Sequence, residues 1–302
     1  MYEQFYGLSE KPFSLTPDTE FLYRYSGHQE ALNVLLVALR NGEGFVRVTG
    51  EVGTGKTLLC RQLLKLLEAD CAIAYLPNPL LTPLELYQAI CHELELSVPA
   101  EASLQQLCQI IFVELARLHK AQRPLVVLID EAQAMPHGSL EALRLLSNLE
   151  TEKDKLLQIV FFAQPEFDQR LAEAKLRQLR QRITFSYQLK SLQEHEVASY
   201  LAHRLHVAGY NGPELFTKAA VGVLYKAAGG VPRLLNLLAH KALLAGYGKG
   251  VGKIDRGIAV KAVQDTAGLK QPRKAVFSPL SVEFALAMVV AVVTFLTWGL
   301  LR

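Results

Sequence analysis

The chain has 302 residues, of which 50% are hydrophobic and 20% are charged, and its 32 basic and 29 acidic side chains leave a formal net charge of +3. At roughly 150 residues per domain this length predicts two folded units, and the apolar, charge-balanced composition excludes a disordered chain and a strongly basic nucleic-acid coat. The mean hydropathy of +0.17 is high for this charge content and indicates a concentrated apolar segment.

The cysteines and the N-terminus indicate a reduced chain without a leader. Cysteines occur at positions 60, 71, 91 and 108, with no C-x-x-C pair and no histidine at metal-ligand spacing. We therefore expect four reduced, buried thiols. Residues 1–15 contain no basic segment followed by an apolar one, so no cleavable signal peptide is expected.

Strand-like and helix-like runs alternate between residues 45 and 191. Apolar runs predict five strands, at 45–49, 72–76, 125–129, 157–163 and 184–189. Helical spacing predicts helices between them, at 58–69, 83–96, 103–121 and 140–149 and in a last helix that ends near Arg182. This alternation predicts a doubly wound α/β domain over residues 1–191, with a five-stranded parallel sheet and helices on both faces.

The segment between the first strand and the first helix has the pattern of a phosphate-binding loop (P-loop). Residues 50–57 read GEVGTGKT and match G-x-x-x-x-G-K-[ST]. Glycines let the chain curl so that backbone amides face phosphate oxygens, and the helix N-terminus adds a favourable dipole. The Lys56 ammonium would reach the β- and γ-phosphates of ATP, and the Thr57 hydroxyl would ligate Mg²⁺. The predicted nucleotide-binding residues of the loop are Gly50, Glu51, Val52, Gly53, Thr54, Gly55, Lys56, Thr57 and Leu58. The alternative is a glycine-rich turn.

Polar side chains follow the third and fourth predicted strands. Asp130 and Glu131 come directly after residue 129, and Gln164 follows residue 163. Because the carboxyl ends of parallel strands form the edge where this fold binds nucleotides, Asp130 is predicted to hold Mg²⁺ through water. Glu131 is predicted to act as the general base on the attacking water, and Gln164 to orient that water or touch the γ-phosphate. The alternatives are a solvent-facing acidic pair and an ordinary polar residue at a strand end.

Residues 175–182 carry four basic side chains and no acidic one, namely Lys175, Arg177, Arg180 and Arg182. One interpretation is a solvated basic helix face. The other is an arginine finger, which one subunit presents to the nucleotide of its neighbour.

Residues 192–268 contain only helical patterns, broken at 209–213, 229–232 and 246–252. They predict a small lid domain of about four helices. Arg233, which follows the segment GGVP, could reach the nucleotide so that the phosphate state sets the angle between the domains. The alternative is a structural arginine.

The apolar excess lies at the C-terminus. Residues 280–301 form a 22-residue stretch, about 33 Å as a helix at ~1.5 Å per residue, which predicts a transmembrane helix. Residues 269–279 precede it as a linker with three basic and no acidic side chains, whereas only Arg302 follows. The positive-inside rule then predicts a single C-terminal span with residues 1–279 in the cytoplasm. The alternative is a buried core helix.

Several motifs together resemble the ExeA / general secretion pathway protein A family of AAA+ ATPases. They are the opening FYGL, KPFSLTPD and FLY with HQEA at 28–31, then GEVGTGKT, LIDEAQ at 128–133, AQPEF at 163–167, LRQRI at 179–183 and GGVPRLLN at 229–236. The resemblance covers about residues 1–300. Because the chain ends at Arg302, it is most similar to the ATPase branch that serves the mannose-sensitive haemagglutinin (MSHA) pilus.

This resemblance implies further roles for individual residues. Gln164 would be sensor 1 and Arg233 sensor 2. Arg182 would be the arginine finger, with Arg180 as second choice, and residues 21–28 would border the adenine.

At the level of the whole protein, the resemblance implies a homo-oligomer, in the form of a hexameric ring, anchored in a bacterial inner membrane by its C-terminal helix. ATP and Mg²⁺ would be its cofactors, and pilus or secretion assembly proteins and membrane lipid its partners, with no nucleic acid. Two alternatives remain open. One is a DNA-directed AAA+ ATPase that helps transposition or replication. The other is a scaffold that uses bound nucleotide only structurally.

Overall fold

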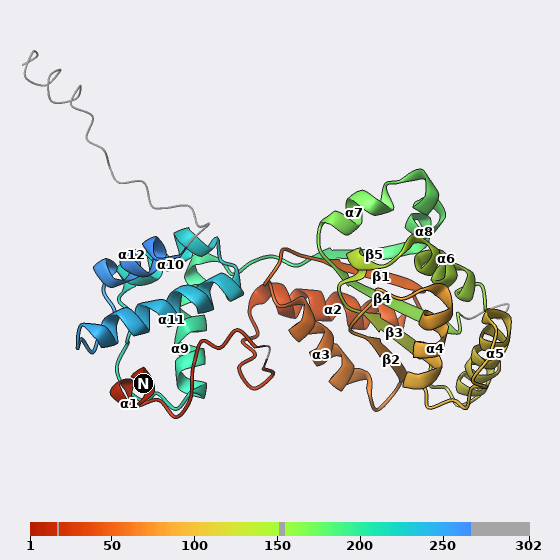
Figure 1. The fold of residues 1–302 in the computed structure, drawn as a ribbon, viewed down its shortest axis with the longest axis horizontal. Coiled ribbons are helices and arrows are strands. Elements are labelled where there is room, and N and C mark those ends of the chain that lie inside the picture. Colours follow the sequence, from red (N-terminus) through yellow and green to blue (C-terminus); the bar gives the residue numbers. More distant parts are fainter. Residues whose placement is uncertain (17, 151–154, 267–302) are drawn as a thin grey trace, which may run out of the picture.

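The larger lobe is built on a parallel β-sheet of five strands (Figure 1). The computed structural model describes residues 1–16, 18–150 and 155–266. The strands are β1 (Phe45–Thr49), β2 (Ala72–Leu76), β3 (Leu125–Ile129), β4 (Leu157–Ala163) and β5 (Ile183–Gln188). Their order is β2-β3-β4-β1-β5, with every neighbouring pair parallel. The predicted five-stranded parallel sheet is therefore confirmed.

Alternate side chains of the central strand β3 enter separate hydrophobic cores on the two faces of the sheet. Val126 and Leu128 of β3 pack with α2 (Ser26–Arg40) and α3 (Lys56–Leu67) on one face. Val127 and Ile129 pack on the other face, which is covered by α4 (Pro83–Glu93), α5 (Leu104–Lys120) and α6 (His137–Leu146). β3 and β4 are buried along their whole length, as expected for central strands with helices on both sides.

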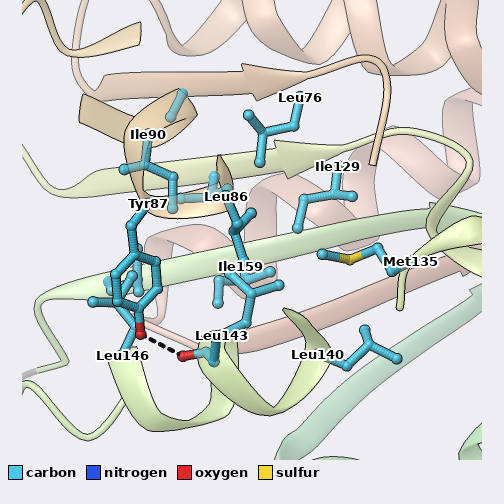
Figure 2. Packing of buried hydrophobic residues seen from close by; sticks show 14 of the residues in the cluster. Leu76, Leu86, Tyr87, Ile90, Ile129, Met135, Leu140, Leu143, Leu146 and Ile159 are labelled. Atoms are coloured by element: carbon cyan, nitrogen blue, oxygen red, sulfur yellow. Dashed lines mark hydrogen bonds between the residues drawn. The ribbon is translucent and has the colours of Figure 1, made fainter. Parts of the chain in front are cut away.

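The core beneath α4 and α6 is shown in Figure 2. Leucine and isoleucine side chains of both helices meet Ile129 and Ile159 of the sheet. The Tyr87 hydroxyl of α4 donates a hydrogen bond of 2.9 Å to the carbonyl oxygen of Ala142 in α6, so the two helices are fixed to each other as well as to the sheet. Each fully buried aliphatic side chain here contributes about 1.5–3 kcal/mol to folding.

Some helix ends differ from the predicted ones for local reasons. The helix predicted at 83–96 ends at Glu93, because Glu95 adopts a left-handed backbone conformation with φ 55°. The helix predicted to end near Arg182 is divided into α7 (Glu166–Leu171), a 3₁₀ turn η2 (Ala174–Leu176) and α8 (Arg177–Arg182). At its start, α4 has a capping box between Thr82 and Glu85.

The smaller lobe contains the four helices expected of the lid: α9 (Glu194–Val207), α10 (Lys218–Ala228), α11 (Pro232–Gly248) and α12 (Arg256–Gln264). The N-terminal segment joins this lobe, although the sequence assigned it to the ATPase domain of residues 1–191. Helix α1 (Tyr2–Tyr6) contacts α11, and Tyr2, Phe13 and Phe21 belong to the lid's hydrophobic core. Aromatic side chains at the N-terminus thus complete a core that four short helices alone leave open.

The predicted linker at 269–279 and the predicted membrane span at 280–301 lie outside the described residues. Within the described part of the chain, no helix combines the length and the apolar character needed to cross a bilayer.

Candidate nucleotide-binding site

The P-loop lies between β1 and α3, as the motif predicts. Tyr25, at the end of the chain's N-terminal segment, and His28 of α2 contact it. Gly53 and Gly55 have φ values of 83° and 96°, a conformation that favours glycine. The Tyr25 hydroxyl donates hydrogen bonds to the carbonyl oxygens of Thr54 (3.2 Å) and Lys190 (2.8 Å). Nε2 of His28 lies 3.2 Å from the same Thr54 oxygen. Helix α3 begins at Lys56, two residues before the predicted start, because Gly55 serves as its N-cap.

Lys56 is buried at the base of the loop, with 4% of its surface exposed. Its Nζ donates hydrogen bonds to the carbonyl oxygens of Gly50 (2.8 Å) and Glu51 (3.0 Å). Burial lowers the pKa of Lys56, and the carboxylates of Glu131 and Asp130 oppose this shift. A triphosphate bound to the loop would give this ammonium stronger acceptors than two carbonyl oxygens.

Asp130 and Thr57 form a pair of oxygen ligands at the edge of the sheet. The Thr57 hydroxyl donates a hydrogen bond of 2.7 Å to Oδ2 of Asp130, and the backbone amide of Glu131 donates one of 2.9 Å to Oδ1. Asp130 is 3% exposed, and burial raises its pKa. A carboxylate and a hydroxyl in contact are the hard oxygen ligands that Mg²⁺ prefers, so these residues fit the predicted metal.

Glu131 and Gln164, which are 33 residues apart in sequence, meet at this edge because β3 and β4 are neighbours. Nε2 of Gln164 donates a hydrogen bond of 2.9 Å to Oε2 of Glu131. Glu131 has a left-handed backbone (φ 51°), a strained conformation for a non-glycine residue that is typical of functional positions. The predicted base and the predicted sensor 1 therefore share one hydrogen bond.

Gln133 completes this cluster, and the sequence analysis gave it no role. Its Nε2 donates to Oε2 of Glu131, and its Oε1 accepts a hydrogen bond of 3.0 Å from the backbone amide of Gln164. The signal that could have identified it is an amide two residues after the predicted base, on a short turn that must fold back towards the strand ends.

A cavity of about 170 Å³ opens between the P-loop and the lid. Its lining includes Lys56, Thr57 and Glu131 of the large lobe and Tyr200, Arg233 and Asn236 of the lid. The backbone amide of Arg233 donates a hydrogen bond of 3.2 Å to the carbonyl oxygen of Gly53, and a Cβ at Gly53 would lie 2.6 Å from Cβ of Arg233. The predicted sensor 2 thus lines the same cavity as the P-loop.

The adenine border predicted at residues 21–28 stays a prediction. Residues 21–28 do not line this cavity, whereas Ser14, Leu15, Thr16 and Asp18 do. Phe21 is instead buried in the lid core beneath the guanidinium of Arg204, and His28 lies against the P-loop carbonyl described above. The N-terminal segment thus borders the cavity with residues that precede the stretch 21–28.

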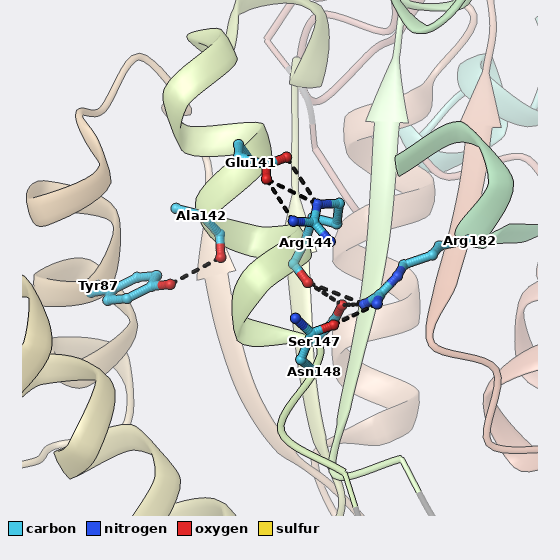
Figure 3. A network of polar contacts seen from close by, with 7 residues as sticks. All are labelled: Tyr87, Glu141, Ala142, Arg144, Ser147, Asn148 and Arg182. Atoms are coloured by element: carbon cyan, nitrogen blue, oxygen red, sulfur yellow. Dashed lines mark hydrogen bonds and ion pairs between the residues drawn. The ribbon is translucent and has the colours of Figure 1, made fainter. Parts of the chain in front are cut away.

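Arg182 lies at the opposite end of the sheet from the P-loop, and Figure 3 shows its polar contacts there. Ile183, the next residue, pairs with Phe45 at the start of β1, whereas the P-loop follows the end of β1. Five residues of strand separate these ends by about 16 Å at ~3.3 Å per residue, so Arg182 does not reach the P-loop of its own chain. Its guanidinium donates to the carbonyl oxygen of Arg144 (3.1 Å), to the Ser147 hydroxyl and to the Asn148 amide oxygen at the end of α6, whereas Arg180 is exposed.

Comparisons with known proteins agree with this architecture. Residues 39–171 match the family model of an AAA domain. The chain is 46% identical over 270 residues to General secretion pathway protein A of Aeromonas hydrophila, an alignment that covers 89% of this chain and 49% of that protein. The chain therefore spans about half the length of this relative.

Solved structures share the fold at low sequence identity. The Aeropyrum pernix ORC2 protein has a TM-score of 0.63 at 16% identity, with 87% of this chain and 73% of that chain covered. The Thermotoga maritima RuvB branch-migration motor has a TM-score of 0.51 at 17% identity, with 80% and 69% covered. Together with the P-loop geometry, these matches show that the chain belongs to the General secretion pathway protein A (ExeA) family and carries an ATPase domain of the AAA+ class.

Proposed function

We propose that the protein is a membrane-anchored, Mg²⁺-dependent AAA+ ATPase whose nucleotide cycle drives assembly of a type IV pilus of the MSHA kind or of a type II secretion complex. The contact that carries the ATPase proposal is the 2.7 Å hydrogen bond between Thr57 and Asp130, with Glu131 and Gln164 joined beside it. Similarity over 89% of the chain to a protein named for general secretion supports the proposed role in pilus or secretion assembly.

The chemistry of the site follows from its side chains. The P-loop amides and Lys56 would hold the triphosphate, and Glu131 would take a proton from the attacking water. Bound Mg²⁺ would supply charge neutralisation between the β- and γ-phosphates, held by Thr57 and through water by Asp130. Arg233 would bring the lid onto the phosphates, so that binding and hydrolysis change the angle between the lobes.

Completion of the site would need a second subunit. In a homo-oligomeric ring, for which we propose six subunits, Arg182 of one chain would stabilise charge at the nucleotide of the next, with Arg180 as the second choice. The position of both residues far from their own P-loop supports action on a neighbour. ATP would then order the contact between subunits, and hydrolysis would release it.

The anchor is proposed from sequence alone. The uncharged stretch 284–301 and the three basic residues of the linker at 269–279 support a single span in a bacterial inner membrane, with the ATPase domain in the cytoplasm. Lipid and the membrane proteins of a pilus or secretion apparatus would be the partners.

Turnover assays on matched variants test the enzymatic proposal. Glu131→Gln should bind ATP, accumulate as an oligomer and hydrolyse about 10²- to 10⁴-fold more slowly than the wild type. Lys56→Ala should lose ATP binding, whereas Lys65→Ala, an exposed lysine on the same helix, should behave as wild type. Wild-type turnover by Glu131→Gln would contradict the assigned base.

The second candidate is a DNA-directed AAA+ ATPase. Exposed basic side chains at Lys175, Arg177 and Arg180 support it, since basic side chains close together in sequence are typical of contacts with phosphates. Strong stimulation of ATP hydrolysis by duplex DNA that disappears at high salt would favour this candidate over the secretion role.

A further inference from the structure

Gln133 is held at three points around the turn that carries Glu131. Its side-chain amide donates to Oε2 of Glu131, and its amide oxygen accepts from the backbone of Gln164, 3.0 Å away. The backbone carbonyl oxygen of Gln133 accepts a hydrogen bond from the guanidinium of Arg170 in α7. The same guanidinium donates a hydrogen bond of 2.7 Å to the backbone carbonyl oxygen of Met135. The side chain therefore has little rotational freedom and forms a fixed link between the ends of β3 and β4.

The two glutamines act on the same oxygen of Glu131. Both Nε2 atoms, of Gln133 and Gln164, donate to Oε2. Among the described residues no hydrogen-bond partner is found for Oε1, so a water molecule can approach that oxygen. A base held by one oxygen presents the other in a defined direction, which is the preorganisation that proton abstraction needs.

We propose that Gln133 is a positioning residue for ATP hydrolysis, which acts by orienting the Glu131 carboxylate towards the attacking water while Gln164 is left to respond to the γ-phosphate. This role rests on the proposed ATPase activity and deepens it. Gln133 would act through Glu131, because its side-chain amide donates a hydrogen bond to the Glu131 carboxylate.

Two substitutions separate the hydrogen bonds of Gln133. Gln133→Met keeps the length of the side chain and removes both of its hydrogen bonds, to Glu131 and to the Gln164 amide. Gln133→Glu keeps an acceptor for the Gln164 amide but replaces the donor with a carboxylate oxygen that repels Glu131. We expect both variants to lower kcat about 10- to 100-fold with less than a twofold change in the Kd of ATP, because a hydrogen bond to a charged group is lost. Gln105→Met, an exposed glutamine of α5, is the matched control and should leave kcat unchanged.

A double-mutant cycle in the full-length protein decides between positioning and mere structural support. If Gln133 acts through Glu131, Gln133→Met should change the residual rate of Glu131→Gln less than twofold. The role is overturned if either Gln133→Met or Gln133→Glu keeps the wild-type kcat. It is also overturned if Gln133→Met lowers the rate by the same factor in the wild type and in Glu131→Gln. Absence of ATP hydrolysis by the wild-type protein would instead overturn the proposed function itself, and this role with it.

Discussion

The contact by which His28 supports the P-loop is sensitive to pH. It is buried behind the loop, and burial lowers its pKa from 6.5 to about 4, although its contact with Thr54 partly opposes this shift. The neutral form is thus required in the folded state. Stability from this group is complete above pH 6.5, the pKa in the unfolded chain, and is lost as the pH falls towards 4.

We therefore predict that acidification from pH 7 to pH 4 lowers the free energy of unfolding by about 3 kcal/mol through His28 alone. Urea denaturation at a series of pH values measures this effect. His28→Asn, which cannot titrate in this range, should show a flatter profile over the same interval. Identical slopes for the two proteins would refute the assignment to His28.

Which functional residues the sequence could predict depends on how local their role is. Lys56, Thr57, Asp130 and Glu131 were identifiable because a strand end and a glycine-rich loop fix their positions within a few residues. Gln133 was not identified, because its role depends on a contact with the backbone of Gln164, 31 residues away. The lining of the cavity by Ser14, Leu15, Thr16 and Asp18 was missed for a similar reason, since the lid core helps to set the path of the N-terminal segment.

At the scale of the elements, α8 and the end of α6 carry the proposed contact between subunits. Arg182 is hydrogen-bonded to three residues that end α6, whereas Arg180 is exposed. Arg182→Ala should lower the free energy of unfolding by about 1–2 kcal/mol and slow hydrolysis, because part-buried acceptors lose a charged donor. Arg180→Ala should leave stability unchanged within about 0.5 kcal/mol.

Mixing of variants separates the finger from a structural arginine. Arg182→Ala and Glu131→Gln should each be slow alone. If the finger acts on a neighbour, mixed oligomers should regain part of the activity, because some interfaces then join an intact base to an intact finger. Wild-type turnover by Arg182→Ala under oligomerising conditions, or no recovery on mixing, would reject Arg182 and direct the same test to Arg180.

The turn between α10 and α11 in the lid depends on a glycine. Gly230 has φ 74°, its carbonyl oxygen accepts a hydrogen bond of 3.0 Å from the Leu192 amide, and an added Cβ would lie 2.0 Å from the Leu192 carbonyl oxygen. Gly230→Ala should therefore lower the free energy of unfolding by more than about 2 kcal/mol, since backbone must move and the left-handed conformation disfavours alanine. Thermal denaturation measures the loss. Gly222→Ala, in α10 with open space around it, should be neutral or stabilising; equal melting temperatures for the two variants would be inconsistent with this account.

Strands were easier to predict than helices in this chain. Four of the five strands, all fully apolar or nearly so, occupy the predicted residues, because buried parallel strands produce continuous apolar runs. The helix predicted up to Arg182 is interrupted by a 3₁₀ turn, which its polar composition did not indicate. The helices that end at Glu93 and Lys120 are followed by residues with a left-handed backbone, Glu95 and Gln122. Neither is a glycine, so the sequence did not indicate these helix ends.

For the whole molecule, the sequence predicted two lobes but divided them differently from the structure. Aromatic side chains near the N-terminus reach across more than 200 residues to the lid, as in the 2.9 Å contact between the Tyr2 hydroxyl and Nδ1 of His240. A contact of that separation leaves no local pattern in the sequence. The lid and the N-terminal segment therefore share one core. Both also line the cavity beside the P-loop, so nucleotide binding there would be coupled to both.

Membrane attachment is the prediction that belongs to the whole chain. The full-length protein should stay in the membrane fraction through alkaline carbonate extraction, because the proposed span would cost too much to expose to water. A variant that ends at residue 266 should be released. Release of the full-length protein by carbonate would contradict the anchor without affecting the ATPase site.

Every proposed role of this protein depends on a triphosphate bound by the P-loop at residues 50–57, between the two lobes. Calorimetric titration of ATP into the purified full-length protein, with Mg²⁺ in excess, measures this directly. The account predicts saturable binding of one ATP per chain that Lys56→Ala abolishes and Lys65→Ala retains. No heat of binding in the folded wild-type protein, or equal binding by Lys56→Ala, would contradict it.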